Sequence, residues 1–431
     1  MKKILQLMII ITFMFLSGCI SNSYVKIPPL PSGSNVKIVV ASDLHYLSKD
    51  AYTKNHSISK PNYYGDGRVI VYSEEIIEAF INDMLIEKPD AVILSGDLTF
   101  DGSIINHNEL TERLSVLVDN NIRVLVQSGN HDINTIGFYY DQKVKAIDGI
   151  TGKQFKKMYY NYGFGNSVSL DENSNSYLYP ISEDLYVLAI DTSIYDDEKK
   201  TYQIGGRVKE ETLNWIDEEL SKLENVDVIA FGHHNLHIHN TKFSSGYQID
   251  NYQELQSVFD KHNVKLYLSG HMHIQSIKTD KTTEILTSSL SITNNHYGII
   301  EYDTNQYNYY TKEIDMNRYA TKISSTDENL LNFSDYSFNF FKESSYKKTY
   351  RNAILNLAED FEVADGLATI QALLNPYYFS GNVDQILDEL YSYEKYYLIN
   401  EYKNPDFSNE YFLSMIASGY RNHNHEIIQI R

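Results

Sequence analysis

Cysteine is almost absent from this sequence, and basic residues are in short supply. Cys19 is the only cysteine among 431 residues, which excludes disulfides within the chain and metal sites built from several thiolates. The 37 lysines and arginines are outnumbered by 57 aspartates and glutamates, which gives a formal charge of −20. Such a surface repels polyanions, so we do not expect a nucleic acid polymer as a partner unless bound metal ions create a local cationic site.

The N-terminal apolar run has the pattern of a targeting segment. Ile4 to Phe15 follows Lys2 and Lys3 and is too short to span a bilayer comfortably, so residues 1–18 are predicted to be a signal peptide. The sequence Leu16-Ser17-Gly18-Cys19 resembles a bacterial lipobox. That resemblance implies cleavage before Cys19, diacylglycerol on its sulfur, and a lipid-anchored protein on the extracytoplasmic face of the cell membrane.

The alternative is an ordinary secretory signal in which Cys19 is incidental. We favour lipidation because the one cysteine occupies the one position that lipidation requires. Residues 19–35 follow, with three prolines and little periodicity, and are predicted to be a tether between membrane and domain.

From Val36 to about Tyr310 the chain alternates strand-like and helix-like patterns. One-sided apolar stripes predict helices over Ser73–Lys88, Glu109–Val118 and Thr212–Leu223. Strands separated by helices pair in parallel, so residues 36–314 are predicted to form a layered α/β domain. The later runs 284–287, 297–302 and 307–314 leave no room for helices and are expected to be an antiparallel finish to a second sheet.

Residues 315–431 have a different, helical pattern. The clearest stretches are 345–360, 364–374, 383–400 and 409–420, with breaks expected at Pro376, Gly381 and Pro405. This part carries no cluster of Asp and His comparable to the front of the chain, so we interpret it as an α-helical interaction or packing domain.

Five segments share one construction, an apolar strand-like run that ends in Asp, Asn or His. Functional residues of parallel sheets gather in loops beyond the carboxyl ends of the strands. The segments therefore predict one site, made of Asp43, His45, Asp97, Asn130 with His131, His233, and His271 with His273.

The spacing of these residues suits two metal ions. Asp43 and His45 lie two apart on an extended segment, so both can turn toward one ion, and His271 and His273 repeat the spacing. Asp97 is single, and a carboxylate can bridge two ions through its two oxygens. Mixed oxygen and nitrogen ligands without thiolate favour Mn, Fe, Zn or Co. Two such ions about 3.5–4 Å apart can hold a bridging hydroxide and clamp a phosphoryl group for in-line attack.

The five blocks, D-x-H, G-D, G-N-H-D, a lone H and G-H-x-H, resemble the calcineurin-like metallophosphoesterase superfamily. The resemblance implies a two-sheet sandwich flanked by helices. It also implies one divalent metal held by Asp43, His45, Asp97 and His273, and a second held by Asp97, Asn130, His233 and His271. His131 would be catalytic, lying beside the phosphate and stabilising the transition state or protonating the leaving oxygen.

One position departs from the family pattern, because Asn235 stands where proline is usual. This leaves the fourth block open between His233 and His234, and we favour His233 because it comes first after the strand. His237 and His239 are expected in a solvated loop rather than at a third metal. We expect His107 to be a supporting or capping residue, and Asp101, Asp132 and Asp191 to orient ligands and loops.

The lipobox, the block Gly96-Asp97-Leu-Thr-Phe-Asp-Gly102 and the helical extension resemble bacterial lipoproteins grouped with class III cyclic-nucleotide phosphodiesterases. The expected activity is a phosphodiesterase acting on a small-molecule phosphoester, either a cyclic nucleotide or another phosphodiester. The alternatives are a phosphomonoesterase or nucleotidase with the same site, and a non-catalytic metal-bearing binding lipoprotein. The last is disfavoured because all seven ligands are retained. The insertion Tyr52–Tyr72 is a candidate substrate-recognition loop, in which Tyr63 or Tyr64 could stack on a base.

Overall fold

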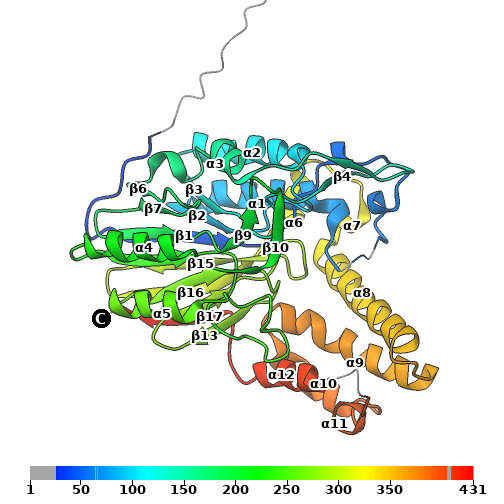
Figure 1. Cartoon of the computed structure of the whole chain (residues 1–431). Helices are drawn as coiled ribbons and strands as arrows, with labels where there is room; N and C mark the ends of the chain where they lie inside the picture. The colour runs from blue at the N-terminus through cyan, green and yellow to red at the C-terminus, as the bar shows by residue number, and fades with distance from the viewer. Residues whose placement is uncertain (1–25, 64, 66, 405–408, 431) are drawn as a thin grey trace, which may run out of the picture.

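The computed structural model describes residues 26–63, 65, 67–404 and 409–430 (Figure 1). The predicted signal peptide, Cys19 and the first part of the predicted tether lie outside these residues. Within them, no helix combines the length and the apolar character needed to cross a membrane.

Two β-sheets form the centre of the molecule. The first sheet has the order β17 (His425–Gln429), β16 (Gln306–Glu313), β15 (His296–Tyr302), β1 (Val36–Ala41), β2 (Ala91–Ser95) and β3 (Arg123–Gln127). The second has the order β13 (Ser276–Thr279), β14 (Thr283–Leu286), β12 (Leu266–Ser269), β11 (Asp227–Phe231), β8 (Leu185–Ala189), β7 (Tyr177–Pro180) and β6 (Ser169–Leu170). Two short ribbons lie outside them, β4 (Gly137–Tyr139) with β5 (Lys145–Ile147), and β9 (Ser193–Asp196) with β10 (Thr201–Gly206).

Helices follow the strands much as the apolar stripes predict. The predicted helices correspond to α1 (Ser73–Glu87), α2 (Ile104–Asp119) and α4 (Glu210–Ser221), while α3 (Gly152–Met158) and α5 (Tyr252–Lys261) complete the front of the chain. Because these helices carry the chain back between strands, β1, β2 and β3 pair in parallel, as do β8, β11 and β12. The α/β sandwich is therefore confirmed.

The core lies between the two sheets and under their helices. One continuous apolar cluster joins inward residues of the first sheet, such as Val39, to Val187 and Ile229 of the second, and includes α1 and α2. A separate cluster packs α4 and α5 against the other face of the second sheet, through residues such as Ile216 and Phe259. Burial on both faces explains why the strands read as continuous apolar runs rather than alternating ones.

The antiparallel strands differ from the expectation in their location. Only β14 belongs to the second sheet, where it pairs in parallel with β12. β15 and β16 instead extend the first sheet, since β15 pairs antiparallel with β1 along Val36–Val40. The predicted antiparallel finish to a second sheet was therefore wrong for these two strands. Strand pairing depends on which edge is vacant in space, and the local pattern carries no record of that.

The C-terminal part is helical, with α6 (Met316–Lys322), α7 (Glu328–Leu331), α8 (Phe333–Leu355), α9 (Phe361–Phe379), α10 (Leu387–Ser392), α11 (Leu398–Glu401) and α12 (Glu410–Ser418). Pro376 lies inside α9 rather than breaking it. The helices α8 to α12 gather at one end of the sandwich (Figure 1). The chain then returns as β17, an unexpected strand that pairs with β16. The last strand of the described chain thus belongs to the first sheet.

The end of the predicted tether lies against the α/β domain. The Leu30 amide donates to Ile181 O at 2.9 Å, and Leu30 O accepts from the Glu183 amide at 2.9 Å. Arg123 donates to Pro28 O at 2.6 Å. From Pro28 onward the segment is therefore attached to the turn before β8 and to β3.

Candidate metal centre

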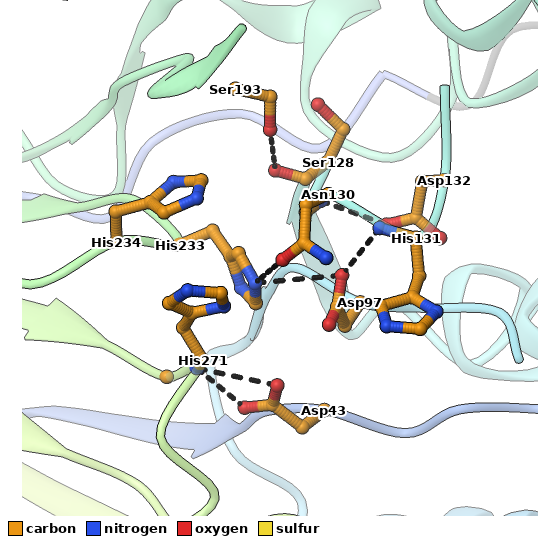
Figure 2. A network of polar contacts seen from close by, with 12 residues as sticks. Asp43, Asp97, Ser128, Asn130, His131, Asp132, Ser193, His233, His234 and His271 are labelled. Atoms are coloured by element: carbon orange, nitrogen blue, oxygen red, sulfur yellow. Dashed lines mark hydrogen bonds and ion pairs between the residues drawn. The ribbon is translucent and has the colours of Figure 1, made fainter. Parts of the chain in front are cut away.

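Five parallel strands from both sheets deliver the predicted site residues to one place. Asp43 and His45 follow β1, Asp97 follows β2, and Asn130 with His131 follows β3. His233 follows β11, and His271 with His273 follows β12. The carboxyl ends of the two sheets meet here, so residues up to 230 positions apart in the sequence become neighbours. Figure 2 shows most of this group.

The first set of candidate ligands is Asp43, His45, Asp97 and His273. Their four candidate ligand atoms lie within 4.8 Å of one another. His45 Nε2 is 2.9 Å from His273 Nε2 and 3.8 Å from Asp97 Oδ2. His273 Nε2 is 3.4 Å from Asp43 Oδ1. Two imidazole nitrogens facing one another between two carboxylates form the arrangement that a shared cation would occupy.

The second set is reached through the other oxygen of Asp97. Asp97 Oδ1 is 3.4 Å from His233 Nε2, which is in turn 3.2 Å from Asn130 Oδ1 (Figure 2). The His271 ring lies beside that of His233, with their centroids 4.9 Å apart. The two oxygens of Asp97 thus face separate ligand sets, which is the geometry that a bridging carboxylate requires.

The hydrogen bonds of His233 and His234 distinguish their roles. His233 Nδ1 lies 3.0 Å from Ser95 O, which leaves Nε2 pointing toward Asp97 and Asn130. His234 has a partner at both nitrogens, Thr192 Oγ1 and Ile204 O, each at 2.9 Å. A carbonyl oxygen only accepts, so His234 Nε2 carries a proton. Although His234 lies close enough to His233 and His271 to form a geometric triad, its nitrogens are committed elsewhere. We therefore assign His233 as the candidate ligand.

The backbone is strained at five of the seven ligands. Asp43, His45, Asp97, His271 and His273 have positive φ angles of 50°, 45°, 45°, 68° and 61°. Such angles are uncommon for residues other than glycine, and they cluster at functional sites, where the surrounding structure maintains the strain.

Two glycines of the motifs are required by close approach rather than by flexibility. A Cβ on Gly129 would lie 2.2 Å from Asp97 Oδ1, and one on Gly270 would lie 2.4 Å from Asp43 Oδ2. Each glycine therefore lets the backbone of one strand end pass directly against a ligand from the neighbouring strand end. This explains the glycine in G-N-H-D and G-H-x-H.

Most of the ligands are held in the protonation state that binds metal. Burial raises the pKa of the Asp97 carboxyl, but the charges of His233 and His131 outweigh this and hold its pKa well below the usual range. Burial, followed by the charge of His233, lowers the pKa of His271 to about 4. Burial, followed by the Arg68 cation, lowers the pKa of His45 well below its ordinary value. Ionised carboxylates and neutral imidazoles are the forms that ligate divalent ions.

His233 is the exception, and its raised pKa indicates that the cluster lacks a positive charge. Burial lowers its pKa, yet the carboxylates of Asp97 and then Asp43 raise it to about 9. The cluster thus binds a proton at His233 because the buried carboxylates need a positive partner. A divalent cation would replace that proton, so the donor set fits two metal ions with oxygen and nitrogen ligands.

Supporting residues hold these loops in register. The Asp132 carboxylate accepts from the amides of Leu98 at 3.0 Å, Thr99 at 2.9 Å and Gly129 at 2.8 Å, so it ties the loop after β2 to the loop after β3. Burial and the nearby Asp97 raise its pKa to about 6. His107 is buried, with Tyr159 Oη at 2.9 Å and Asp132 O at 3.0 Å.

Asp101 and Asp191 likewise bind loops. Asp101 accepts from the Phe138 amide at 2.9 Å. Asp191 accepts from Tyr195 Oη at 2.7 Å and from the Asn175 amide at 3.1 Å. Both side chains therefore orient segments around the site, as expected from their positions.

His239 is buried and His237 is half-buried, which corrects the expectation of a solvated loop, while Ile238 between them is 43% exposed. His239 is 8% exposed and its Nε2 lies 3.0 Å from Glu284 Oε2. Glu284 is fully buried in β14 and also accepts from the Leu236 and His237 amides at 2.8 and 2.6 Å. A buried carboxylate needs hydrogen-bond donors, and residues of this loop supply them to Glu284. Glu284 follows His239 by 45 residues, so no local pattern indicated the contact.

A cavity of about 550 Å³ opens beside the two ligand sets. Its lining includes Asp97, Asn130, His131, His271 and His273. Several other lining residues were not predicted from the sequence, namely Phe100, Phe138, Tyr140, Tyr202, Ile204 and Tyr247. Tyr202 and Ile204 come from β10, and their alternation with polar residues was the only local signal. Tyr247 comes from a loop without periodicity.

The insertion Tyr52–Tyr72 contributes Arg68 to the cavity. Tyr63 is not among the described lining residues and packs against a small cluster that includes Leu47 and Ile58. Tyr64 lies outside the described residues. Base stacking by these two tyrosines therefore gains no support from the structure.

Two family models match the chain, and known proteins resemble it. The family model described as calcineurin-like phosphoesterase matches residues 36–275, and the model for the C-terminal domain of cyclic nucleotide phosphodiesterase matches residues 315–421. The chain is 27% identical over 191 residues to a protein of Moraxella catarrhalis named "probable cyclic nucleotide phosphodiesterase", covering 43% of this chain and 58% of the relative. It is 24% identical over 281 residues to an Arabidopsis thaliana protein named as a metallophosphoesterase, covering 60% of this chain and 32% of the relative.

The chain thus spans less than two thirds of either relative. Among solved structures, a dimetal phosphatase from Danio rerio aligns with a TM-score of 0.48 and 14% identity, covering 64% of this chain and 96% of that one. The family match covers more than half of the 431 residues, and its range contains all the motif blocks that converge on the cavity. This chain belongs to the calcineurin-like phosphoesterase family, whose members are hydrolases of phosphoesters with a dinuclear metal site.

Proposed function

We propose that the chain is a two-metal phosphodiesterase that hydrolyses a cyclic nucleotide or another small phosphodiester. The observation that carries the proposal is the cavity beside the metal ligands. It measures about 550 Å³ and has aromatic walls that include Phe100, Tyr140 and Tyr247. A diester carries carbon on two of its phosphate oxygens, which such walls can pack against, whereas a monoester carries carbon on only one. The match to the C-terminal domain of cyclic nucleotide phosphodiesterase supports the same substrate class.

The ligands would hold the metals in two sets that share Asp97. When bound, two divalent cations supply positive charge beside the phosphoryl oxygens. They also lower the pKa of a bound water molecule to near neutrality. Five of the seven candidate ligands have positive φ angles, a strain that the surrounding structure maintains before substrate enters. Little reorganisation is then needed when substrate enters.

His131 is the residue placed to move a proton. Its backbone amide donates to Asp97 Oδ1 at 2.9 Å, and its Nδ1 lies 2.9 Å from Phe100 O. A carbonyl oxygen only accepts, so Nδ1 carries a proton and Nε2 is left to exchange a proton in the cavity. As water adds to phosphorus and the ester P–O bond breaks, the leaving oxygen needs a proton. We assign its source as His131 Nε2–H of the doubly protonated ring, and the proton released by the attacking water restores that form.

One set of substrates tests the diester preference. A manganese-loaded sample should hydrolyse bis(p-nitrophenyl) phosphate and a cyclic nucleotide, with kcat/KM for the chromogenic diester above that for p-nitrophenyl phosphate. The same sample stripped with a chelator is the control for metal dependence. A monoester rate clearly ahead of both diesters would contradict the proposal and favour a phosphatase or nucleotidase with the same two-metal site.

A further inference from the structure

Arg68 lies in the metal cavity but belongs to neither ligand set. It is 8% exposed and lines the cavity together with His131 and His273. Among the described residues of that lining, it is the only arginine or lysine. A guanidinium stays charged across the working pH range and presents several N–H donors in one plane. The cavity therefore contains one permanent cation beyond any metal ion.

The Arg68 guanidinium lies over an aromatic ring. The Arg68 guanidinium carbon lies 4.8 Å from the centroid of Phe100, the residue whose carbonyl oxygen faces His131 Nδ1. A cation–π contact of this kind holds the guanidinium in place, and the planar group carries its N–H donors around its edge. Such an edge matches the oxygens of a phosphoryl group, which it can bind in pairs.

The C-terminal helix α8 contacts the segment that carries Arg68. A Cβ on Gly67 would lie 2.6 Å from ring atoms of Phe341, so that ring packs directly on the Gly67 backbone. Phe341 is 3% exposed and packs on Phe379 of α9, with their centroids 4.9 Å apart. Gly67 also has a φ of +99°, which an L residue rarely adopts.

Further contacts fix the insertion on both sides of this point. Tyr336 of α8 donates to Pro61 O at 2.7 Å. Tyr72 donates to Asp327 at 2.9 Å, and the Val69 amide donates to Ser291 O at 2.8 Å. The insertion is thus enclosed between the α/β domain and the first helices of the C-terminal part.

We propose that Arg68 binds a non-bridging phosphoryl oxygen of the substrate, and that Phe341 of α8 positions it by packing on Gly67. The inference rests on the proposed function in that it assigns substrate recognition to the same cavity. It also gives the C-terminal helices a task, since a helix outside the metal-binding part holds a substrate-binding residue in place.

The first experiment removes the charge. Hydrogen bonds to charged groups contribute enough that Arg68→Gln should lower kcat/KM for the diester by about 10- to 100-fold, with Arg68→Lys intermediate. Affinity for inorganic phosphate, measured by calorimetry on the manganese-loaded full chain, should fall by a similar factor while metal content stays unchanged. Arg351→Gln, which removes an exposed arginine of α8, is the matched control and should leave both quantities as they are.

The second experiment tests the role of α8. Phe341→Leu should raise KM more than it lowers kcat, because it loosens the segment carrying Arg68 without touching the metals. In the Arg68→Gln background the same change should have little further effect, since residues that act through one contact are not additive. Phe338→Leu is the control, because Phe338 lies on the same helix but packs on Tyr377.

The outcomes separate this inference from the proposed function. If the wild type hydrolyses diesters and Arg68→Gln matches it in both kcat/KM and phosphate affinity, Arg68 does not bind substrate. If Phe341→Leu and Arg68→Gln add in full, α8 does not act through Arg68. A metal-loaded wild type that cleaves no ester refutes the proposed function alone, because phosphate affinity still decides the role of Arg68.

Discussion

Two histidine-rich clusters include residues of the loop after β11, and they differ in what their ring nitrogens face. At the metal centre, His45 Nε2 and His273 Nε2 face one another at 2.9 Å beside two carboxylates. In the second cluster, around Glu284, His239 Nε2 lies 3.0 Å from the carboxylate and its Nδ1 lies 2.9 Å from Ser276 Oγ. The first cluster opens into a cavity, and the second is closed and satisfied.

The backbone differs in the same way. Five ligands of the metal centre have positive φ, whereas none of Leu236, His237, His239 and Glu284 does. Backbone strain is present at the metal centre, where the lone pairs of the candidate ligands face one another. It is absent around Glu284, whose buried carboxylate accepts hydrogen bonds. The number of histidines therefore does not identify a metal site, and the directions of their nitrogens do.

The largest effect is expected at Asp97, because both ligand sets depend on it. Asp97→Ala should leave at most about one metal ion per chain and lower kcat by more than about 10⁴-fold. Elemental analysis after metal loading and dialysis, together with kinetics, would measure both. The wild type should bind about two ions. A variant that still binds two would show that Asp97 does not bridge.

His131→Ala should come next, with a loss of activity but not of metal. The Nε2 atom of His131 is available for proton transfer, and removal of a general acid–base group lowers kcat by roughly 10²–10⁴-fold. The elemental analysis used for Asp97→Ala should still give about two ions per chain. Loss of an ion in this variant would show that His131 is a metal ligand rather than a residue that only transfers a proton.

His234 gives a finer test within the metal centre. Both of its nitrogens are hydrogen bonded, so His234→Ala should weaken metal binding by only about 10- to 100-fold, the usual cost of removing a supporting contact. His233→Ala is the matched control and should abolish binding of the second ion. Titration with manganese would give both affinities. Equal losses in the two variants would show that the assignment to His233 is wrong.

The smallest effect on the metals is expected at the closed cluster. Glu284→Gln removes the charge that accepts from two amides and faces His239, so the free energy of unfolding should fall by about 1.5–3 kcal/mol. Urea unfolding of the full chain would measure this change. Metal content should stay at about two ions per chain. If Glu284→Gln lost an ion, the distinction between the two clusters would fail.

The sequence by itself determined the layered fold and predicted the candidate site residues that converge at the strand ends. Each motif block is a short apolar run with polar residues at its end, and the parallel pairing implied by the intervening helices brings such ends to one edge. Asp43 and His45, or His271 and His273, could therefore be placed near one another without coordinates. The stripes of α1, α2 and α4 were equally local, and their bounds agree with the expectation to within a few residues at each end.

Only the tertiary structure decided the features that depend on contacts between residues far apart in the sequence. The strands β15, β16 and β17 join the first sheet because its edge is open in space. The burial of His239 depends on Glu284, and the place of Arg68 depends on Phe341, which lies more than 270 residues further along the chain. Such contacts have no period and no fixed spacing, because the folded packing selects the partner from the whole chain. The choice between His233 and His234 likewise depends on tertiary contacts. Thr192 and the Ile204 carbonyl contact both ring nitrogens of His234, which leaves His233 as the candidate ligand.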